Sequence, residues 1–374
     1  MGRVSRPVRS SRPHWAARIE DRFNSRLARE LRERGWQLRV EPYVGYGTPR
    51  QVRLLARALY TRPQDDQARI ADEVRPVTPG YVGDQQRNRP ARNEPMRAVR
   101  GWRSFFTASA PACPVRVEVG GHSFELECDR GGYLDATVDV DLPTGWQEAT
   151  LSTDHPQLGT SDQVTMPLLI IGDDVSLGVV SDIDDTVMVT ALPRPMLAAW
   201  NALMLHENAR RVVPGMPVLY AEIEHRHPGT PVIYLSTGAW NVAPALRRFL
   251  ASHGFPAGPL LLTDWGPTNT GIFRSGREHK DRNLRQLVEM FPQIKWLLIG
   301  DDGQHDPEIY GALAREHPDQ VRAIALRELT PSEHVLSHGA PAGTGDAQPG
   351  PQVPQVHGHD GSVLRESLDA SGLI

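Results

Sequence analysis

The sequence predicts a parallel α/β domain that follows an all-β, sandwich-like domain, and three patterns support this. From about residue 176 to 330, short apolar runs alternate with amphipathic stretches, which is typical of a parallel sheet covered by helices on both faces. From about 41 to 175, the runs alternate apolar with polar residues and are separated by Gly and Pro turns, as in a sandwich. The length of 374 residues allows two domains with tails, because about 150 residues is typical of one domain.

The β domain is predicted from four alternating runs. These are VRVEV (115–119), SFELEC (123–128), ATVDVDL (136–142) and TMPLLII (165–171). The first two flank Gly120-Gly121-His122, and glycines between two alternating runs predict a hairpin. Gly172-Asp173-Asp174 joins the last run to the next apolar run, and we interpret it as another hairpin turn.

The α/β domain is predicted from five continuous apolar runs. They are LGVVS (177–181), VIYLS (232–236), PLLLT (259–263), WLLIG (296–300) and RAIAL (322–326). Amphipathic stretches at 242–254 and 281–291 lie between runs and predict helices. Ligands bind outside the carboxyl ends of the strands in such sheets, so we expect a site among the residues that follow the runs.

Charge is distributed unevenly along the chain. The formal net charge is -4, yet residues 1–40 hold eleven Arg and four acidic residues, which makes a basic arm of net charge +7. The arm also carries an apolar stripe at helical spacing, formed by Trp15, Ile19, Phe23, Leu27 and Leu31. One interpretation is a helix that makes peripheral contact with an anionic membrane; the other is a helix packed on the neighbouring domain with its Arg side chains in solvent.

Composition excludes several classes of protein. No apolar run approaches the ~18 residues that span a membrane, and the N-terminus lacks the apolar core of a secretory signal. Cys113 and Cys128 are too few for a disulfide framework, and we favour two free buried thiols in a reducing cytoplasm over a cross-hairpin bond. There is no P-loop and no broad basic surface, which argues against nucleic acid as a partner. Residues 338–374, rich in Gly, Pro, Gln and His, predict a disordered tail that ends in a short helical turn.

Chemistry-bearing residues follow the first two strands. Asp182, Asp184 and Thr186 come directly after LGVVS, where a buried strand ends and unpaired carboxylates would be costly. Two such carboxylates can divide labour between nucleophile and general acid, or they can simply cap a following helix. Ser236 and Thr237 end the next strand, where a hydroxyl at a helix start can hold phosphate or serve as an ordinary cap.

The later strands add a lysine and an acidic cluster. Lys280 opens the helix after PLLLT and could neutralise a phosphoryl group, although a lone lysine at a helix start is usually just solvated. Asp301, Asp302 and Asp306 follow WLLIG, and acids at this density repel each other unless a cation holds them. Carboxylate oxygens suit Mg²⁺, so the sequence predicts a magnesium site here.

Taken in order, these motifs resemble those of a known superfamily. Strands that end in Asp-x-Asp-x-Thr, then Ser/Thr, then Lys, then several Asp are similar to the haloacid dehalogenase (HAD) superfamily of aspartate-nucleophile phosphohydrolases. SDIDDTV, LSTGAWN, HK and LIGDDGQHDPEIY resemble the catalytic domain of the actin-patch-associated phosphatidate phosphatase family, and PYVGYGT (42–48) resembles its bacterial members. The resemblance implies a HAD-like Rossmannoid parallel sheet. The roughly 45 residues between the first two motifs leave room only for a small cap and predict an open site.

The resemblance also implies a role for each motif residue. Asp182 matches the nucleophile that forms an aspartyl-phosphate, and Asp184 matches the general acid and later base. Ser236 matches the phosphate-binding hydroxyl, with Thr237 as its rival and Thr186 in the same phosphate-binding set. Lys280 matches the basic residue that steadies the phosphoryl group. Asp301 matches the principal Mg²⁺ ligand, helped by Asp302 or Asp306. In the superfamily the first Asp side chain and the backbone carbonyl of the third residue complete the metal site, which implicates Asp182 and Asp184 again.

The expected reaction is Mg²⁺-dependent hydrolysis of a phosphomonoester, and an open site suits a bulky or membrane-held substrate such as phosphatidate. Two alternatives stay open. One is a soluble phosphatase that acts on sugar phosphates or phosphoproteins. The other is a catalytically inert module that binds phosphorylated ligands. The expected location is the cytoplasm, with peripheral membrane contact if the basic arm binds lipid.

Overall fold

A computed structural model describes residues 4–5, 30–31, 33–62, 108–156, 158–189, 211–263, 276–303, 305–330, 333 and 353–374. Most of the basic arm lies outside these residues, including four of the five positions of its apolar stripe. The fifth, Leu31, packs against the core of the β domain. No helix within the described residues combines the length and apolar character needed to cross a membrane.

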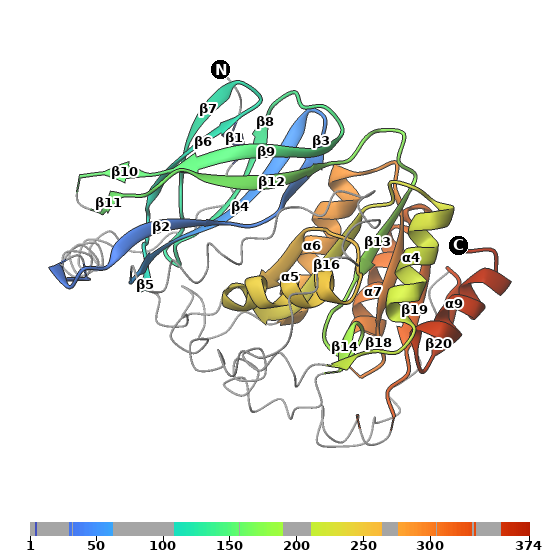
Figure 1. Ribbon diagram of the computed structural model, residues 1–374. Coiled ribbons are helices and arrows are strands. Elements are labelled where there is room, and N and C mark those ends of the chain that lie inside the picture. Colours follow the sequence, from blue (N-terminus) through green and yellow to red (C-terminus); the bar gives the residue numbers. More distant parts are fainter. Residues whose placement is uncertain are drawn as a thin grey trace, which may run out of the picture.

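The N-terminal region is rich in β-strands, as predicted, and lies beside the α/β region (Figure 1). Within the described residues its main sheet has ten strands, eight of them in the order β1-β8-β4-β3-β12-β9-β6-β7, with β2 and β5 paired to β4. The strands are β1 (Val4–Ser5), β2 (Gln37–Pro42), β3 (Gly45–Thr48), β4 (Gln51–Thr61), β5 (Ala108–Ser109), β6 (Pro114–Val119), β7 (His122–Glu127), β8 (Tyr133–Asp139), β9 (Gly145–Ser152) and β12 (Val164–Ile170). A short hairpin of β10 (Asp154–His155) and β11 (Gly159–Thr160) accompanies them.

Alternating residues of these strands build one core. Strands from both halves of the sheet, such as β4 and β6, contribute to the same apolar cluster, so the sheet folds over a shared interior. The parallel pair β3–β12 joins its two halves into one continuous hydrogen-bonded sheet. The predicted hairpin is confirmed: β6 pairs with β7, and Gly120 and Gly121 adopt φ of 56° and 75°. Cys113 and Cys128 are free and buried, as expected.

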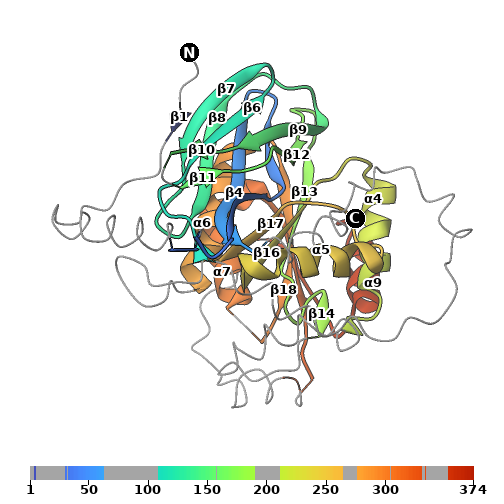
Figure 2. The same cartoon turned by 60° about the vertical axis from the view of Figure 1, so that its left-hand side comes forward.

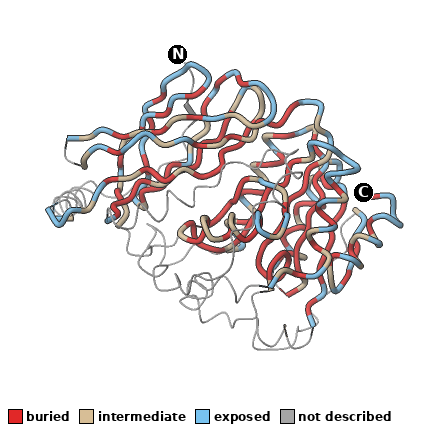
Figure 3. The backbone as a smooth tube through the Cα atoms, in the orientation of Figure 1, coloured by how far each residue is buried: buried red, intermediate tan, exposed pale blue. Residues whose placement is uncertain are grey.

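The C-terminal region contains a parallel sheet in the order β17-β16-β13-β18-β19-β20, six strands among the described residues. The strands are β13 (Leu177–Ser181), β16 (Val232–Ala239), β17 (Leu260–Thr263), β18 (Lys295–Asp301), β19 (Val321–Arg327) and β20 (Gln355–Gly358). The first five coincide with the five predicted apolar runs. Their central residues are apolar because helices bury both faces of the sheet, and Figure 3 shows this interior as a continuous buried region.

Helices cover the two faces of this sheet. α6 (Gly276–Met290) and α7 (Asp306–Glu316) lie on one face, and α4 (Met216–Arg226) and α9 (Gly361–Ala370) lie on the other (Figure 2). α5 (Ala243–Ser252) follows β16 after the short 3-10 turn η3 (Trp240–Val242), and η4 (Pro318–Gln320) precedes β19. A small hairpin of β14 (Met188–Val189) and β15 (Arg211–Val212) stands between the first two motifs. The rest of the predicted small cap, 190–210, lies outside the described residues.

The prediction of a disordered tail over 338–374 is wrong for the described residues 353–374, although the helical turn predicted at its end is present as α9. β20 pairs in parallel with β19 and extends the sheet, and α9 begins at an Asp360 cap whose carboxylate accepts from two backbone N–H groups. Leu364 and Leu368 of α9 are fully buried. The overall Gly and Pro content hid the amphipathic spacing of this short segment, whose apolar face is needed to cover the sheet.

The two regions share a contact surface. Gly172-Asp173-Asp174 is not the hairpin turn that we expected; it connects β12 of one sheet to β13 of the other. Tyr43 of the β domain stacks on Trp240 with ring centroids 4.1 Å apart. Arg53 of β4 reaches α6, where its Nη1 donates to Asn283 Oδ1 at 3.0 Å. The β domain therefore touches α6, which carries Lys280, and η3, which directly follows the strand that carries Ser236 and Thr237.

Candidate active site

The loop after β13 places two carboxylates at the carboxyl edge of the parallel sheet. Asp182 and Asp184 are both buried, since the chain turns back at once so that Asp184 bridges Met188. The turn requires a positive φ of 56° at Asp185, a conformation that costs energy for a residue other than Gly. Arg327 of β19 donates to the Asp185 carbonyl at 2.7 Å and holds this turn in place.

Lys280 of α6 joins the first and last motifs. Its Nζ lies 2.6 Å from Asp182 Oδ1 and 2.6 Å from Asp306 Oδ1, and all three side chains are buried. Burial alone would lower the pKa of Lys280, but the two carboxylates outweigh it and raise that pKa above its ordinary value. The lysine is therefore a fixed cation between two acids, whereas the sequence alone left open an ordinary solvated lysine.

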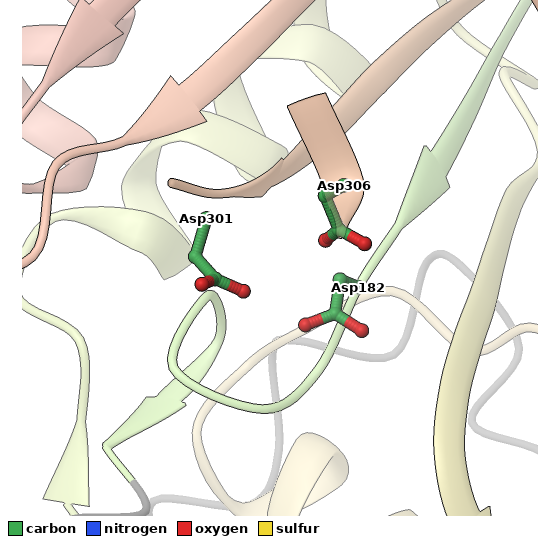
Figure 4. A group of neighbouring side chains, drawn as sticks. All are labelled: Asp182, Asp301 and Asp306. Carbon is green, nitrogen blue, oxygen red and sulfur yellow. The ribbon is translucent and has the colours of Figure 1, made fainter. Parts of the chain in front are cut away.

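Three buried carboxylates gather around one point. Oxygens of Asp182, Asp301 and Asp306 lie within 4.8 Å of one another, and Figure 4 shows the three groups turned toward each other. Burial, followed by the neighbouring acids, raises the pKa of Asp301 well above its usual range. Burial likewise raises the pKa of Asp182, even though Lys280 opposes the shift. One ammonium thus faces three acids, which leaves an excess of negative charge in a buried site.

This cluster fits a divalent cation. Asp301 Oδ2 and Asp306 Oδ2 are buried with no hydrogen-bond partner among the described residues, so each of these two carboxylates keeps an oxygen without a donor. Mg²⁺ prefers oxygen ligands, and one or two carboxylates completed by water and substrate oxygens are its common protein site. Asp301 Oδ1 already accepts from the Gly303 N–H at 2.8 Å, which fixes the orientation of that carboxylate.

The hydroxyl motif is tied to the second acid. Ser236 is fully buried, and its Oγ donates to Asp184 Oδ2 at 2.8 Å and accepts from the Gly238 N–H at 2.9 Å. The rival position, Thr237, is half-buried, and its carbonyl accepts from Thr263 Oγ1 at 2.8 Å. Of the two hydroxyls, only that of Ser236 is hydrogen-bonded to a motif acid in the described part of the chain.

Of two further predicted site residues, Thr186 contacts the first acid and Asp302 lies outside the acid cluster. Thr186 Oγ1 lies 3.4 Å from Asp182 Oδ2, so this hydroxyl contacts the first acid directly. Asp302 is outside the three-acid group, and its Oδ1 accepts from the Leu329 N–H at 2.9 Å instead. The structure therefore brings together Asp182, Asp301 and Asp306 but leaves Asp302 beside a backbone amide.

Sequence reasoning missed a pair of hydroxyl groups behind the first acid. Tyr220 of α4 donates a short hydrogen bond to Ser181 Oγ, and Ser181 Oγ donates to the Asp182 carbonyl at 2.6 Å. Tyr220 and Ser181 are both buried, and this pair fixes the backbone at the point where Asp182 leaves the strand. The signal that could have indicated Ser181 is its place as a polar residue at the end of an otherwise apolar strand.

Comparison with known proteins agrees with this geometry. Residues 177–328 match the model of a family described as "Phosphatidate phosphatase APP1, catalytic domain". This stretch includes all four motifs, from the Asp182 loop to the acids after β18, and the resemblance predicted from those motifs is confirmed for it.

Two curated fungal proteins are similar to the chain. It is 26% identical over 235 residues to Phosphatidate phosphatase APP1 of Saccharomyces cerevisiae, which covers 60% of this chain and 39% of that relative. It is 22% identical over 154 residues to an uncharacterised protein of Schizosaccharomyces pombe, which covers 41% of this chain and 25% of the relative. The chain thus spans well under half the length of the curated relatives that it matches.

Among solved structures, the HAD domain of effector protein Lem4 from Legionella pneumophila shares 17% identity with the chain, covering 42% of this chain and 87% of that domain. Its TM-score of 0.29 is too low to support a structural argument. The parallel sheet and the residues at its carboxyl edge define the class of protein. It is an α/β domain in which a buried lysine lies between buried aspartates. The family whose catalytic domain resembles residues 177–328 is that of the APP1 phosphatidate phosphatases.

Proposed function

We propose that this chain is a Mg²⁺-dependent, HAD-like phosphatase that uses Asp182 as its nucleophile to hydrolyse phosphomonoesters. The observation that carries the proposal is the position of Lys280, whose ammonium bridges Asp182 and Asp306 at 2.6 Å inside a buried acid cluster. A phosphate dianion and an attacking carboxylate repel each other. Positive charge beside the carboxylate must offset this repulsion, and here the ammonium of Lys280 and a cation bound by the acid cluster would supply it.

Asp182, Asp301 and Asp306 would hold the metal, with the unsatisfied Oδ2 atoms of Asp301 and Asp306 as its natural ligands. When bound, Mg²⁺ supplies positive charge that offsets the phosphoryl oxygens and orients them for in-line attack. Asp302 is not required for this site, since its Oδ1 is committed to the Leu329 amide.

The chain's own residues can perform both halves of the reaction. A carboxylate oxygen of Asp182 attacks phosphorus, the ester P–O bond breaks, and the departing alkoxide takes a proton from Asp184, which leaves an aspartyl-phosphate. Asp184, now a carboxylate, accepts a proton from water. The water oxygen attacks the same phosphorus, the bond to Asp182 breaks, and inorganic phosphate leaves with the carboxylate of Asp182 restored.

Ser236 and Lys280 are the groups that steady the transferred phosphoryl. Lys280 can exchange part of its contact with Asp182 for a phosphoryl oxygen without moving far, since it is already fixed by Asp306. Ser236 stands beside Asp184 and can donate to the phosphoryl oxygen while Asp184 carries its proton. Thr186 touches Asp182, which supports a role in orienting the nucleophile as well as in binding phosphate.

Phosphatidate is the substrate that we propose, with diacylglycerol and phosphate as products. The support is the name of the yeast relative, a phosphatidate phosphatase. Peripheral contact of a cytoplasmic protein with the membrane through the basic arm would bring the site to such a substrate. A soluble phosphatase for sugar phosphates or phosphoproteins is the second candidate, because the catalytic centre described above does not itself select the leaving group.

The test measures Mg²⁺-dependent phosphate release from phosphatidate in mixed micelles, with a soluble aryl phosphate alongside. Wild type is compared with Asp182→Asn and with a variant that lacks residues 1–35. Turnover of phosphatidate that disappears in Asp182→Asn would support the proposal. Turnover of the aryl phosphate alone would keep the chemistry and discard the lipid substrate, and binding of phosphorylated ligands without any release would indicate an inert module.

A further inference from the structure

We propose that Arg53 of the β domain is a positioning residue for Lys280, which it influences through Asn283 and the helix α6. The inference deepens the proposed function and rests on it. The β domain would then contribute to catalysis, because its Arg53 side chain would fix the position of the Lys280 ammonium in the active site of the α/β domain.

Arg53 is a buried arginine at the boundary between the two domains. Its Nε and Nη2 donate to the two carboxylate oxygens of Asp135 on the neighbouring strand β8, at 2.7 and 2.8 Å. Its Nη1 donates to the Tyr46 hydroxyl at 2.6 Å and to Asn283 Oδ1 at 3.0 Å. The planar guanidinium is thus locked inside its own domain by three bonds and presents a fourth to α6, which favours a rigid support.

Asn283 passes this contact to the turn of α6 that carries the lysine. The amide is buried, and its Nδ2 donates to the His279 carbonyl at 2.9 Å. His279 is the residue immediately before Lys280, so one amide group connects the guanidinium of Arg53 to the backbone next to the catalytic cation.

The start of α6 is also held on its other side. His279 Nε2 lies 3.3 Å from the Leu261 carbonyl of β17, and burial lowers the pKa of His279 to about 4. The ring is therefore neutral near pH 7 and can donate to that carbonyl. A Cβ built on Gly276 would lie only 2.6 Å from a methyl carbon of Thr237, so the first turn packs tightly against the second motif. α6 is clamped between the sheet and Arg53.

Fixing the position of α6 matters for catalysis because Lys280 has to contact two carboxylates at the same time. Its ammonium lies 2.6 Å from both Asp182 and Asp306, and a small shift of the helix would lengthen at least one contact. A displacement of about 1 Å can cost up to about 10²-fold in rate when it moves a group that acts on the transition state. A role confined to joining the domains would instead change stability without changing turnover.

The experiment measures kcat and KM for a soluble aryl phosphate with saturating Mg²⁺ in Arg53→Met, Asn283→Leu, the double variant and Asn283→Asp. We expect kcat to fall about tenfold in either single variant while KM changes less than about twofold. The double variant should be no slower than the slower single variant, because both changes break the same connection. Asn283→Asp keeps an oxygen acceptor for Arg53 but loses the Nδ2 donor to the His279 carbonyl, so its kcat should stay as low as that of Asn283→Leu.

Arg247→Met is the matched control, since Arg247 of α5 makes a different bond between the domains, to the Pro42 carbonyl at 3.2 Å. Its kcat should equal that of wild type. Melting temperatures of all variants are recorded, so that a fall in kcat is judged only at temperatures where each variant is folded. An unchanged kcat in Asn283→Leu, or losses that multiply in the double variant, would overturn the proposal.

Hydrogen exchange of the peptide that covers α6 gives a readout independent of activity. We expect faster exchange of this peptide in Arg53→Met and Asn283→Leu but not in Arg247→Met. If the wild-type protein releases no phosphate, the proposed function fails. The coupling between Arg53 and α6 is still supported if the exchange rates rise as expected, and it is overturned if they do not.

Discussion

Ser236 donates a hydrogen bond of 2.8 Å to the carboxylate of Asp184, and this joins the residue proposed to hold phosphate to the residue proposed to move protons. Without substrate, the hydroxyl has both a donor and an acceptor role, since it also accepts from the Gly238 amide. When Asp184 carries a proton, its need for this donor falls and the hydroxyl can turn to a phosphoryl oxygen. Protonation of the acid and binding of phosphate are therefore expected to favour each other.

The first prediction concerns Asp184→Asn and the nature of the leaving group. An amide keeps the bond with Ser236 but cannot protonate a departing oxygen. General acid catalysis contributes about 10²–10⁴-fold, and that contribution matters most for a basic alkoxide. We expect Asp184→Asn to lose about that much kcat/KM on an alkyl phosphate and markedly less on a nitrophenyl phosphate, whose leaving group is stable without a proton.

Asp182→Asn serves as the reference in this comparison. It removes the proposed nucleophile, so both substrates should lose activity to a similar extent. Equal losses on the two substrates in Asp184→Asn would contradict the general-acid role and would point to Asp184 as a structural or metal-binding residue only.

The second prediction concerns Mg²⁺ and the melting temperature. A cation at about 100 times its Kd stabilises the folded protein by about 2.7 kcal/mol, so Mg²⁺ should raise the melting temperature of wild type. Asp301→Asn should abolish this rise. Without Mg²⁺ the variant should melt no lower than wild type, because the change relieves repulsion from Asp182 and Asp306 and can keep the Gly303 contact.

Asp302→Asn is the control for that measurement. Its carboxylate accepts from the Leu329 amide and stands outside the acid cluster, so the Mg²⁺-dependent rise should persist in it. The assignment of the metal ligands would have to be abandoned if Asp301→Asn kept the full rise while Asp302→Asn lost it.

Much of the site was predictable because buried parallel strands have a simple pattern. An apolar run ends where the sheet ends, so the acids after β13 and β18 could be placed at one edge from sequence alone. The choice between Ser236 and Thr237 could not be made in this way, since neighbouring residues on a strand point to opposite faces and the end of the strand was uncertain by one residue.

Other features had no pattern that sequence could show. Arg53 and Asn283 are 230 residues apart, and nothing in either segment indicates the other. The choice between Asp302 and Asp306 could not be made either, because the sequence does not indicate that Asp302 accepts from the Leu329 amide while Asp306, the first residue of α7, joins the acid cluster. The last strand was missed, and the last helix was predicted only as a short turn, because composition was averaged over a segment whose first and second halves differ.

The third prediction concerns His279 and the pH dependence of stability. Burial lowers the folded-state pKa of His279 from 6.5 to about 4. Between these values the unfolded chain binds a proton that the folded protein does not, so stability falls as pH falls through this window. We expect His279→Gln to flatten the dependence of the unfolding free energy on pH between about 6.5 and 4, measured by urea titration.

The matched variant is His122→Gln, which changes an exposed histidine at the start of β7. It should leave the pH dependence as in wild type. A dependence that is equally steep in wild type and His279→Gln would mean that the imidazole of His279 takes up its proton in the folded protein as readily as in the unfolded chain.

The fourth prediction tests whether the C-terminal segment belongs to the fold. Leu364 is fully buried where α9 covers the parallel sheet, and a Leu→Ala change at such a position costs about 2–5 kcal/mol. Glu366, on the exposed side of the same helix, should change the unfolding free energy by less than about 0.5 kcal/mol when replaced by Ala. A disordered tail would make both substitutions silent.

The same helix meets α4 so closely that a Cβ on Gly361 would lie 2.2 Å from the Met216 backbone nitrogen, so Gly361→Ala should destabilise the protein as well. Urea titrations of the three variants would thus separate a docked helix, which is sensitive at Leu364 and Gly361 alone, from a segment that contributes nothing to the fold.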